Sequence, residues 1–464
     1  MQQDRLSINR RKLLKIMSLL LAGLATDIQA AAGFEKQINP HKKRILVIGA
    51  GLAGLAAAQK LQKQGHDVIV VEARNRIGGR IWTSSQWPDI PLDLGATWIH
   101  GVKGNPLTKL AQQINTKRLA TSYASTIVYN AVGSPLSSKE EARLDQLRRK
   151  VFQLLKDAQS SDNDISIKQS IKTLSQQANL TTADRQFLSF ILSGNIEQEY
   201  SGSASELSAH WYDDAKNFRG DDALFLNGFR VIPEYLAQNL QIELGQSVKE
   251  IHWTQSPIYV ISDKTEYLID HVIVTLPLGV LKAGSVQFVP ELPSFKQEAI
   301  NQLGMGVLNK CYLRFNKAFW PTDVDWLEYI SPQHGEWTEW VSFMRAANLP
   351  VLLGFNAADR GREIEAWTDQ QIVASAMQTL KTLYGSNVSE PLDYQITRWA
   401  SDPFALGSYS FNAVGSTPLM RKELAKPLNG HVHFAGEASE TEHFSTAHGA
   451  YLSGVRAAKE VLSA

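Results

Sequence analysis

The chain has 464 residues, of which 44% are hydrophobic and 20% are charged, and its formal net charge at pH 7 is +1. The length allows two or three packed domains, and the charge gives no reason to expect a nucleic-acid partner or an anionic membrane surface. The only cysteine, Cys311, excludes an intrachain disulfide and a cysteine metal cluster, and the histidines show no spacing typical of a metal site.

The first 32 residues predict an export signal. A basic segment at residues 10–15 precedes a short apolar segment at residues 16–25, and three alanines at residues 30–32 offer a small-residue cleavage site. The apolar segment is too short for a stable membrane span. The arginine pair of the basic segment resembles a twin-arginine signal. The twin-arginine export machinery reads such signals and carries folded proteins. The resemblance therefore predicts a periplasmic or secreted location. An ordinary secretory signal and a retained N-terminal anchor are the alternatives.

Residues 45–64 have the pattern of a nucleotide-binding strand, turn and helix. An apolar run leads to glycines at Gly49, Gly51 and Gly54, and a helical stretch follows. Gly49 allows the tight turn, Gly51 lets the backbone approach a pyrophosphate, and Gly54 lets the helix pack closely on the strand. Free N–H groups at the start of the helix attract the anion. This order of elements predicts a dinucleotide site.

A second strand is predicted at residues 68–71 and ends on Glu72, whose carboxylate can bind a ribose diol. An acidic residue here favours an unphosphorylated adenosine ribose over that of NADP. The segment at residues 76–80 adds a second glycine pair followed by Arg80. This extension resembles the flavoproteins with two dinucleotide-binding domains, in which the arginine contacts the FAD diphosphate. The resemblance therefore implies FAD.

A helical region follows. Ser138 with Glu141 predicts a capping box, and apolar residues recur behind it at helical spacing. Further helices are predicted at residues 167–178 and 183–192, and Gly194 is expected to end the second of them.

Strand patterns surround this region. The other predicted elements are a strand and loop at 91–101, strands at 248–252, 258–261 and 271–275, an antiparallel sheet from 307–315, 326–330, 337–344 and 351–356, a helix at 369–383, a strand at 431–435 and a helix at 446–462.

Together these elements predict an α/β fold, α+β overall, of the class with two dinucleotide-binding domains. We expect a discontinuous, Rossmann-like FAD-binding domain and an inserted substrate-binding domain made of an antiparallel sheet plus helices. The expected FAD-binding segments are residues 43–115, 225–285 and 395–464, and the expected substrate-binding segments are residues 116–224 and 286–394.

Five segments in chain order resemble the flavin-containing amine oxidases, in particular their polyamine and spermine oxidase branch. They are residues 45–80, 94–101, 272–281, 308–310 and 435–454. The resemblance implies FAD-dependent oxidation of a small-molecule amine, here a polyamine. In that reaction a hydride passes from an amine C–H to flavin N5, the imine hydrolyses to an aldehyde and a shorter amine, and O2 is reduced to hydrogen peroxide.

The resemblance gives the catalytic role to Lys310, as a buried lysine that holds a water against flavin N5. A buried amine has a movable pKa, which suits O2 reduction or imine hydrolysis. His100 is expected at the substrate entrance, and Tyr409 as one wall of an aromatic cage around the amine. Thr446 replaces the second tyrosine wall of monoamine oxidases, and Ser445 can accept a hydrogen bond from the amine. Surface or core positions without a functional role are the alternatives for Lys310, His100 and Tyr409.

Two further expectations concern covalent attachment and charge. Ser408 stands where monoamine oxidases carry the cysteine bonded to the flavin, and serine cannot form that thioether, so FAD should be non-covalent. A polycationic substrate calls for carboxylates in its tunnel. Glu197 and Glu199 are the candidates by position, with a solvated loop as the alternative.

The resemblance also implies the cofactor contacts. The helix that starts near Thr446 can direct its N–H groups at the flavin pyrimidine edge, where reduced flavin is negatively charged. The full expected set is Gly49, Ala50, Gly51, Gly54, Glu72, Ala73, Arg74, Gly79, Arg80, Gly95, Ala96, Thr97, Trp98, Val248, Trp399, Gly436, Glu437, Thr446 and Ala447.

Several alternatives share the fingerprint. They are a monoamine or L-amino acid oxidase, a flavin desaturase or porphyrinogen-type oxidase, and a FAD-holding protein without activity. An L-amino acid oxidase needs an arginine for the substrate carboxylate, and the sequence identifies none. The sequence leaves open which polyamine is cut, free or acetylated, at which C–N bond, and the oligomeric state.

Overall fold

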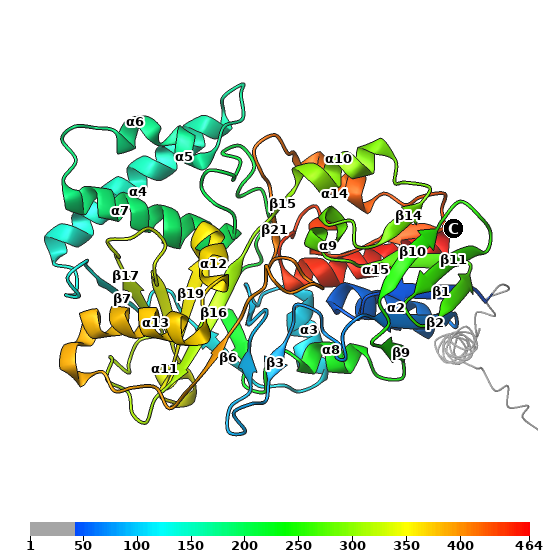
Figure 1. The fold of residues 1–464 in the computed structure, drawn as a ribbon, viewed down its shortest axis with the longest axis horizontal. Coiled ribbons are helices and arrows are strands. Elements are labelled where there is room, and N and C mark those ends of the chain that lie inside the picture. Colours follow the sequence, from blue (N-terminus) through cyan, green and yellow to red (C-terminus); the bar gives the residue numbers. More distant parts are fainter. Residues whose placement is uncertain (1–41) are drawn as a thin grey trace, which may run out of the picture. The chain divides into compact units, whose positions relative to one another are not determined.

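A five-stranded parallel sheet carries the glycine motif in the computed structural model, which describes residues 42–464 (Figure 1). The strand order is β22-β13-β1-β2-β9, and every neighbouring pair is parallel. The strands are β1 (Arg44–Ile48), β2 (Asp67–Glu72), β9 (Gln241–Leu244), β13 (His271–Val274) and β22 (Val432–Phe434). Residues 43–464 form one compact unit, so the boundaries between the two expected domains stay a prediction. The expected export signal lies outside the described residues, and its location stays a prediction too.

Both faces of the parallel sheet are buried, because alternate residues of its strands point to opposite sides. On one face Val47 and Ile273 pack with α2 (Leu52–Lys63) and α15 (Ala447–Ser463). On the other face Leu46 packs with a four-stranded sheet of order β12-β11-β10-β14. Its strands are β10 (Val248–His252), β11 (Ile258–Ser262), β12 (Glu266–Ile269) and β14 (Gln287–Val289).

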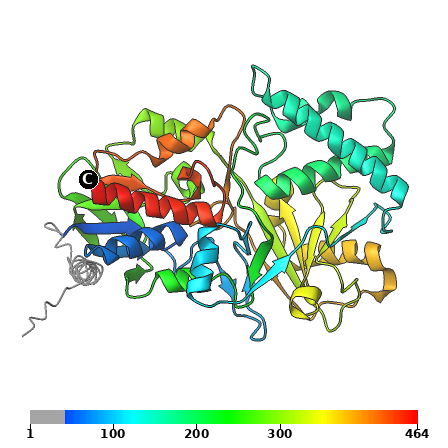
Figure 2. The same ribbon diagram turned by 180° about the vertical axis from the view of Figure 1, so that it is seen from behind.

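Two glycines set the close packing of these helices. A Cβ at Gly54 would lie 1.9 Å from the carbonyl oxygen of Gly49, and a Cβ at Gly454 would lie 2.0 Å from that of Ala53. Glycine therefore lets α2 lie against the turn after β1 and lets α15 lie against α2, side by side in Figure 1 and Figure 2. Helix α2 begins at Leu52, directly after its N-cap Gly51.

A six-stranded sheet of order β20-β16-β19-β18-β17-β7 forms the second large layer. The four predicted strands are confirmed and pair antiparallel, but β7 joins β17 in parallel, so the sheet is mixed. On one face, Ile372 of α13 (Asp369–Tyr384) packs with Cys311, and Figure 1 shows α13 beside this sheet. The strands are β7 (Thr126–Tyr129), β16 (Leu308–Arg314), β17 (Trp326–Tyr329), β18 (Glu339–Ser342), β19 (Val351–Ala357) and β20 (Asp393–Ile396).

The helical region differs from the prediction at its start. Helix α4 (Ser138–Gln159) is capped by Ser137, and Glu140 closes the capping box, one residue before the predicted pair. Asn130 donates a hydrogen bond of 3.1 Å to Glu140, which selects this frame over the equally spaced Ser138 and Glu141.

Gly194 does not end the helix α7 (Thr182–Leu192), contrary to the prediction. The chain continues without a break as a π-helix, η1 (Ser193–Gln198). A Cβ at Gly194 would lie 3.3 Å from Oε1 of Glu339. Glycine at this position therefore makes room for a carboxylate and does not end the helix. A π-turn shifts the direction of every side chain that follows it, and such turns are frequent at functional sites.

Within residues 42–464, no helix has the length and apolar character needed to cross a bilayer.

The other elements connect these layers. These elements are α3 (Pro106–Gln113), α5 (Ile167–Ser170), α6 (Lys172–Ser175), α8 (Val231–Leu236), α9 (Leu278–Lys282), α10 (Ser294–Gln302), α11 (Phe343–Ala347), α12 (Ala358–Glu365), α14 (Pro418–Ala425), β3 (Thr83–Ser84), β4 (Leu92–Asp93), β5 (Trp98–Ile99), β6 (Arg118–Thr121), β8 (Asp222–Phe225), β15 (Gly304–Met305), β21 (Ser410–Phe411), η2 (Gly385–Asn387) and η3 (Glu437–Ser439).

Candidate active site

One cavity of about 1060 Å³ extends from the glycine turn after β1 to the six-stranded sheet. Its volume is at the upper end of the range for ligand pockets, which suits a long ligand. The residues expected at the site that line it are Gly49, Gly51, Glu72, Ala73, Arg74, Gly79, Arg80, Gly95, Ala96, Thr97, Trp98, His100, Glu199, Val248, Lys310, Trp399, Ser408, Tyr409, Gly436, Glu437, Ser445, Thr446 and Ala447.

The glycine turn fits the pyrophosphate and ribose of FAD. Gly49 has a φ of +108°, which glycine adopts readily, and a Cβ at Gly51 would meet no atom within 4 Å. In the described chain no side chain caps α2, so its first N–H groups are free for an anion. Glu72 is buried and accepts hydrogen bonds from the N–H groups of Ala50, at 2.8 Å, and Arg74, at 2.9 Å. Each of its oxygens keeps a lone pair for a ribose hydroxyl.

Replacing Gly51 by valine is expected to prevent FAD binding while leaving the fold intact. The new side chain would enter the open space beside the turn, and the cost to the apo-protein is about 1 kcal/mol because Gly51 is also the N-cap. The measurements are the flavin-to-protein absorbance ratio after reconstitution and the urea unfolding of the apo-protein. Gly54→Val is the matched control, since its side chain would collide with the Gly49 carbonyl and lower stability instead. Full flavin content in Gly51→Val would contradict the assignment.

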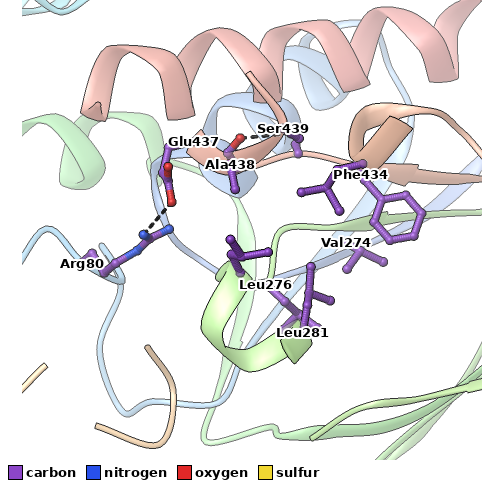
Figure 3. A pocket seen from close by; sticks show the side chains of 12 residues that line it. Arg80, Val274, Leu276, Leu281, Phe434, Glu437, Ala438 and Ser439 are labelled. Atoms are coloured by element: carbon purple, nitrogen blue, oxygen red, sulfur yellow. Dashed lines mark hydrogen bonds and ion pairs between the residues drawn. The ribbon is translucent and has the colours of Figure 1, made fainter. Parts of the chain in front are cut away.

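Arg80 and Glu437 form an ion pair at the wall of the cavity. The Arg80 guanidinium donates to Oε1 of Glu437 at 2.8 Å and to the Ser408 carbonyl at 3.0 Å, and Figure 3 shows the two side chains facing each other beside an apolar group. Glu437 is 4% exposed. Burial alone would raise the pKa of Glu437, but Arg80, the Ser410 hydroxyl and Arg421 hold it below its ordinary value. The pair therefore presents fixed charges to this part of the cavity.

Lys310, on β16, is buried and lines the cavity. Its ammonium donates to the carbonyl oxygens of Asp93, at 2.8 Å, and Gly95, at 2.6 Å, and to the Thr97 hydroxyl. Burial lowers the pKa of Lys310, and the Asp93 carboxylate opposes part of that change. Burial likewise raises the pKa of Asp93, although the Thr83 hydroxyl and Lys310 oppose it. Lys310 can thus exchange a proton near neutral pH.

His100 lines the cavity and pairs with a residue that the sequence analysis missed. Its Nδ1 lies 2.8 Å from Oδ2 of Asp222, and the other oxygen of that carboxylate, Oδ1, accepts the N–H of Gly101 at 2.8 Å. Enclosure would lower the pKa of His100, but Asp222 and then Glu199 raise it above its ordinary value. Asp222 lies on β8, more than a hundred residues away, so no local pattern in the sequence identifies it.

The expected cage residues are fixed by hydrogen bonds to the backbone. The Tyr409 hydroxyl donates to the Gln198 carbonyl at 2.7 Å, which aims its ring along the cavity wall. Thr446 is the N-cap of α15 and accepts the N–H of Gly449 at 2.9 Å. The Ser445 hydroxyl donates to the Ser410 carbonyl, so its oxygen keeps only acceptor capacity toward the cavity.

Three expected site residues do not line the cavity. Glu197 accepts the N–H of Ala204 at 2.9 Å and lies 2.7 Å from Nε2 of His334, so its carboxylate faces away from the cavity and is bound within the protein. Ala50 contributes its N–H to Glu72 instead, and Gly54 sets the distance between helix and turn. Of the two glutamates expected to bind substrate, only Glu199 stays a candidate.

The sheet end of the cavity holds carboxylates and aromatic rings that the sequence analysis missed. Tyr123 and Trp326 stack with ring centroids 4.4 Å apart, and Trp326 stacks with Trp98 at 5.8 Å. Glu328 and Glu339 line the cavity beside these rings. Over residues 42–464, no group of three or more histidine, cysteine or acidic residues is placed to hold a metal ion.

Sequence relatives cover nearly the whole described chain. Polyamine oxidase 4 of Oryza sativa subsp. japonica is 33% identical over 432 residues, which make up 90% of this chain and 88% of that protein. Probable polyamine oxidase 4 of Arabidopsis thaliana is 32% identical over 445 residues, 92% of this chain and 88% of that protein. Lysine-specific histone demethylase 1 homolog 1 of Oryza sativa subsp. japonica is 35% identical over 446 residues, but this chain spans only 52% of its length.

Solved structures share the fold. Wild-type putrescine oxidase bound to putrescine aligns with a TM-score of 0.73 and 19% identity, over 91% of this chain and 100% of that chain. The predicted α/β fold with separate sheets is thereby confirmed. The family model described as flavin containing amine oxidoreductase matches residues 52–462. The chain belongs to this family of enzymes, as its five motif segments predicted.

Proposed function

We propose that this enzyme is a polyamine oxidase that binds its FAD non-covalently. The observation that carries the proposal is a single cavity that joins the glycine turn to a chamber of carboxylates and aromatic rings, with Lys310 in the wall between them. Carboxylates attract a substrate with several positive charges, and aromatic faces favour cations and their alkyl linkers. The polyamine oxidases among the relatives, which the chain matches over most of their length, support the same substrate class.

Bound FAD would supply the redox chemistry, as acceptor of a hydride and donor of electrons to O2. The protein has three tasks around it. Tyr409 and the chamber orient the amine, and the acidic wall holds the nitrogens that stay charged. Lys310, with its lowered pKa, holds or gives up a proton at Nζ, which assists hydrolysis of the oxidised amine. The Ser408 hydroxyl is hydrogen-bonded to the backbone N–H and carbonyl of Leu308. A serine offers no thiol for covalent attachment of FAD.

Anaerobic mixing of the FAD-loaded enzyme with spermine or spermidine tests the proposal. Bleaching of the yellow flavin is the expected result, followed on admission of air by one hydrogen peroxide per aldehyde. A peroxide assay with putrescine, acetylated polyamines, monoamines, L-amino acids and a methylated lysine peptide separates the related activities. Absence of bleaching with every polyamine would reject the proposal, and bleaching by the peptide alone would favour a demethylase.

Asp222→Asn is expected to shift the pH dependence of KM to lower pH. Asp222 raises the pKa of His100, so removing its charge lowers the pH at which His100 loses its proton. A protonated His100 repels a cationic substrate, and KM for a polyamine should fall as the pH rises through that pKa. The measurement is KM for spermidine across pH in the two proteins.

Asp221→Asn is the matched control for this experiment. Asp221 is the neighbouring exposed acid. Its replacement by asparagine removes the same charge without touching the His100 ring. Titration of the substrate itself is common to all three proteins and cancels in the comparison. If KM for spermidine changed at the same pH in Asp222→Asn and Asp221→Asn, the ion pair between Asp222 and His100 would not govern substrate binding.

A further inference from the structure

A loop at residues 397–408 forms part of the cavity wall and is bonded at both ends to the strand that carries Lys310. At the start of this wall loop, the N–H of Lys310 donates to the Thr397 hydroxyl at 2.8 Å. At its end, the Ser408 hydroxyl accepts the N–H of Leu308 at 2.8 Å and donates to the Leu308 carbonyl at 3.1 Å. One short stretch of β16 therefore holds the whole wall loop. The residues of the loop that line the cavity are Trp399, Pro403, Phe404 and Ser408.

Asn309 uses the full hydrogen-bonding capacity of its amide to hold the start of the wall loop. The residue is 1% exposed and does not line the cavity. Its Oδ1 accepts the Thr397 hydroxyl and the N–H of Trp399, both at 3.0 Å. Its Nδ2 donates to the Gly361 carbonyl at 3.1 Å and to Oε1 of Glu365 at 2.6 Å. Because the amide has two donor and two acceptor positions, all of them are occupied and only one orientation of the side chain fits.

Glu365, the last residue of α12, receives the other end of this network. Besides Asn309, its carboxylate accepts the N–H of Ala400 at 2.8 Å, the N–H of Ser401 at 2.7 Å and the Ser401 hydroxyl. The end of a helix carries a partial negative charge and disfavours a carboxylate, so the helix gives no reason for an acid at this position. The four donors offset that cost, and the acid fixes the backbone directly after Trp399.

The network sets the position of Trp399 relative to Lys310. The indole N–H of Trp399 donates to the Leu94 carbonyl at 3.2 Å. The ammonium of Lys310 donates to the carbonyls on either side of it, those of Asp93 at 2.8 Å and Gly95 at 2.6 Å. Two side chains that line the cavity thus share three successive carbonyl oxygens of one segment. Their separation depends on the register between β16 and the wall loop, which the hydrogen bonds described above determine.

We propose that Asn309 and Glu365 are positioning residues of the oxidation reaction, which act through the wall loop to hold the Trp399 indole and the Lys310 ammonium at the separation that bound FAD requires. The inference rests on the proposed function, because it takes the flavin to lie against both side chains. Neither Asn309 nor Glu365 lines the cavity, so neither binds the substrate. A displacement of about 1 Å at reacting groups costs up to about 100-fold in rate. Loss of either residue should therefore lower kcat and leave KM nearly unchanged.

Asn309→Ala tests the inference, and Asn356→Ala is its matched control. Asn356 lies directly opposite Asn309 on β19 and is also 1% exposed, but within the described residues neither polar atom of its amide has a hydrogen-bond partner. Both variants remove the same buried atoms from the same face of the sheet. Asn309→Ala should lower kcat for spermidine about tenfold or more, whereas Asn356→Ala should nearly keep the wild-type value. Equal losses of kcat in the two variants would overturn the inference.

Glu365→Ala extends the test to α12, with Glu363→Ala as its control. Glu363 belongs to the same helix, is exposed and pairs with Arg360 at 3.0 Å. The change at Glu365 should lower kcat about tenfold or more, as Asn309→Ala does, because it releases the backbone after Trp399. The change at Glu363 should leave kcat nearly unaltered. A rise in KM without a fall in kcat at Glu365 would contradict the positioning role.

A conservative pair of variants at Thr397 separates the hydrogen bonds of the network from the packing around it. The Thr397 hydroxyl joins the N–H of Lys310 to Oδ1 of Asn309. Thr397→Ser keeps this hydroxyl and loses a methyl group, whereas Thr397→Val keeps the volume and loses the hydroxyl. Thr397→Ser should therefore have the higher kcat of the two. The opposite order would show that packing, and not the network, matters at this position.

A further readout needs no amine. The bound flavin is reduced by light and mixed with O2, which gives the rate of flavin reoxidation, and the visible spectrum of the oxidised flavin reports its surroundings. At full flavin content, Asn309→Ala should slow reoxidation about tenfold and change the shape of the flavin absorption band, and Asn356→Ala should do neither. An unaltered reoxidation rate in Asn309→Ala would reject the inference. If no amine bleaches the wild-type flavin, the proposed function fails, but the reoxidation rates still decide the role of Asn309.

Discussion

Replacing Lys310 by methionine is expected to slow turnover at least about 100-fold, which is the usual contribution of one positioned acid–base group. Methionine keeps the length and apolar stem of lysine but cannot carry the proton that Nζ holds in the cavity wall. FAD should stay bound, since none of the groups at the glycine turn is altered. The measurement is the rate of anaerobic flavin bleaching and of peroxide formation, at equal flavin content.

A loss of stability could also slow turnover, and Lys296→Met is the control that separates the two causes. Lys296 is fully buried outside the cavity, and it donates to three backbone carbonyls at the end of α14, as Lys310 donates to three oxygens near β4. Burial lowers the pKa of Lys296 to about 7. Each group left unpaired costs about 1–3 kcal/mol, so both variants should be destabilised. Similar turnover in the two variants would remove the catalytic role from Lys310.

Glu437→Gln is expected to lower the free energy of unfolding by about 3–5 kcal/mol, the cost of removing one partner from a buried ion pair. Glu437 is the anion for Arg80 and also accepts the Ser410 hydroxyl at 2.7 Å and the Ser445 N–H at 3.1 Å. The fully buried Arg421 also attracts this carboxylate. The variant leaves Arg80 without its counter-charge and removes one of the two carboxylates that act on Arg421. Urea unfolding of the apo-protein at neutral pH measures the loss.

The pH dependence of this difference follows from the lowered pKa of Glu437. A carboxylate whose folded pKa lies below its unfolded value stabilises the protein above that unfolded value, and the gain disappears as the pH falls through the folded pKa. The gap between wild type and Glu437→Gln should therefore narrow at acidic pH. Glu390→Gln is the control, because Glu390 pairs with Lys381 in an exposed position and should cost about 1 kcal/mol or less. A gap that stays constant down to strongly acidic pH would contradict the charge argument.

The parts of the site that the sequence predicted depend on local backbone chemistry. The turn at Gly49, the open approach at Gly51 and the ending of β2 on Glu72 each need a given residue at a fixed spacing, and the cavity begins at these residues. Lys310 was identified by a motif in a family, not by its own neighbourhood in the sequence. The oxygens that hold it come from residues more than two hundred positions earlier, and no local pattern reveals them.

The failure at Glu197 has a geometric reason. Residues two apart on a helix point about 200° apart, so Glu197 and Glu199 cannot both face one cavity while the chain stays helical. The prediction that Gly194 ends the helix hid this conflict, and the π-helix decided that Glu199 faces the cavity. Glu328 and Glu339 were missed because the register between two strands, which a single sequence does not reveal, brings them together.

The contact between α2 and α15 has a consequence for how the protein acquires its cofactor. Helix α2 follows the first strand of the described chain, whereas α15 comes much later in the sequence. The packing of α15 on α2 through Gly454 closes the wall that includes Thr446 and Ala447. A growing chain lacks this wall until α15 is made, and it leaves the apolar face of α2 uncovered. Stable cofactor binding must therefore wait until α15 has been made and has packed on α2.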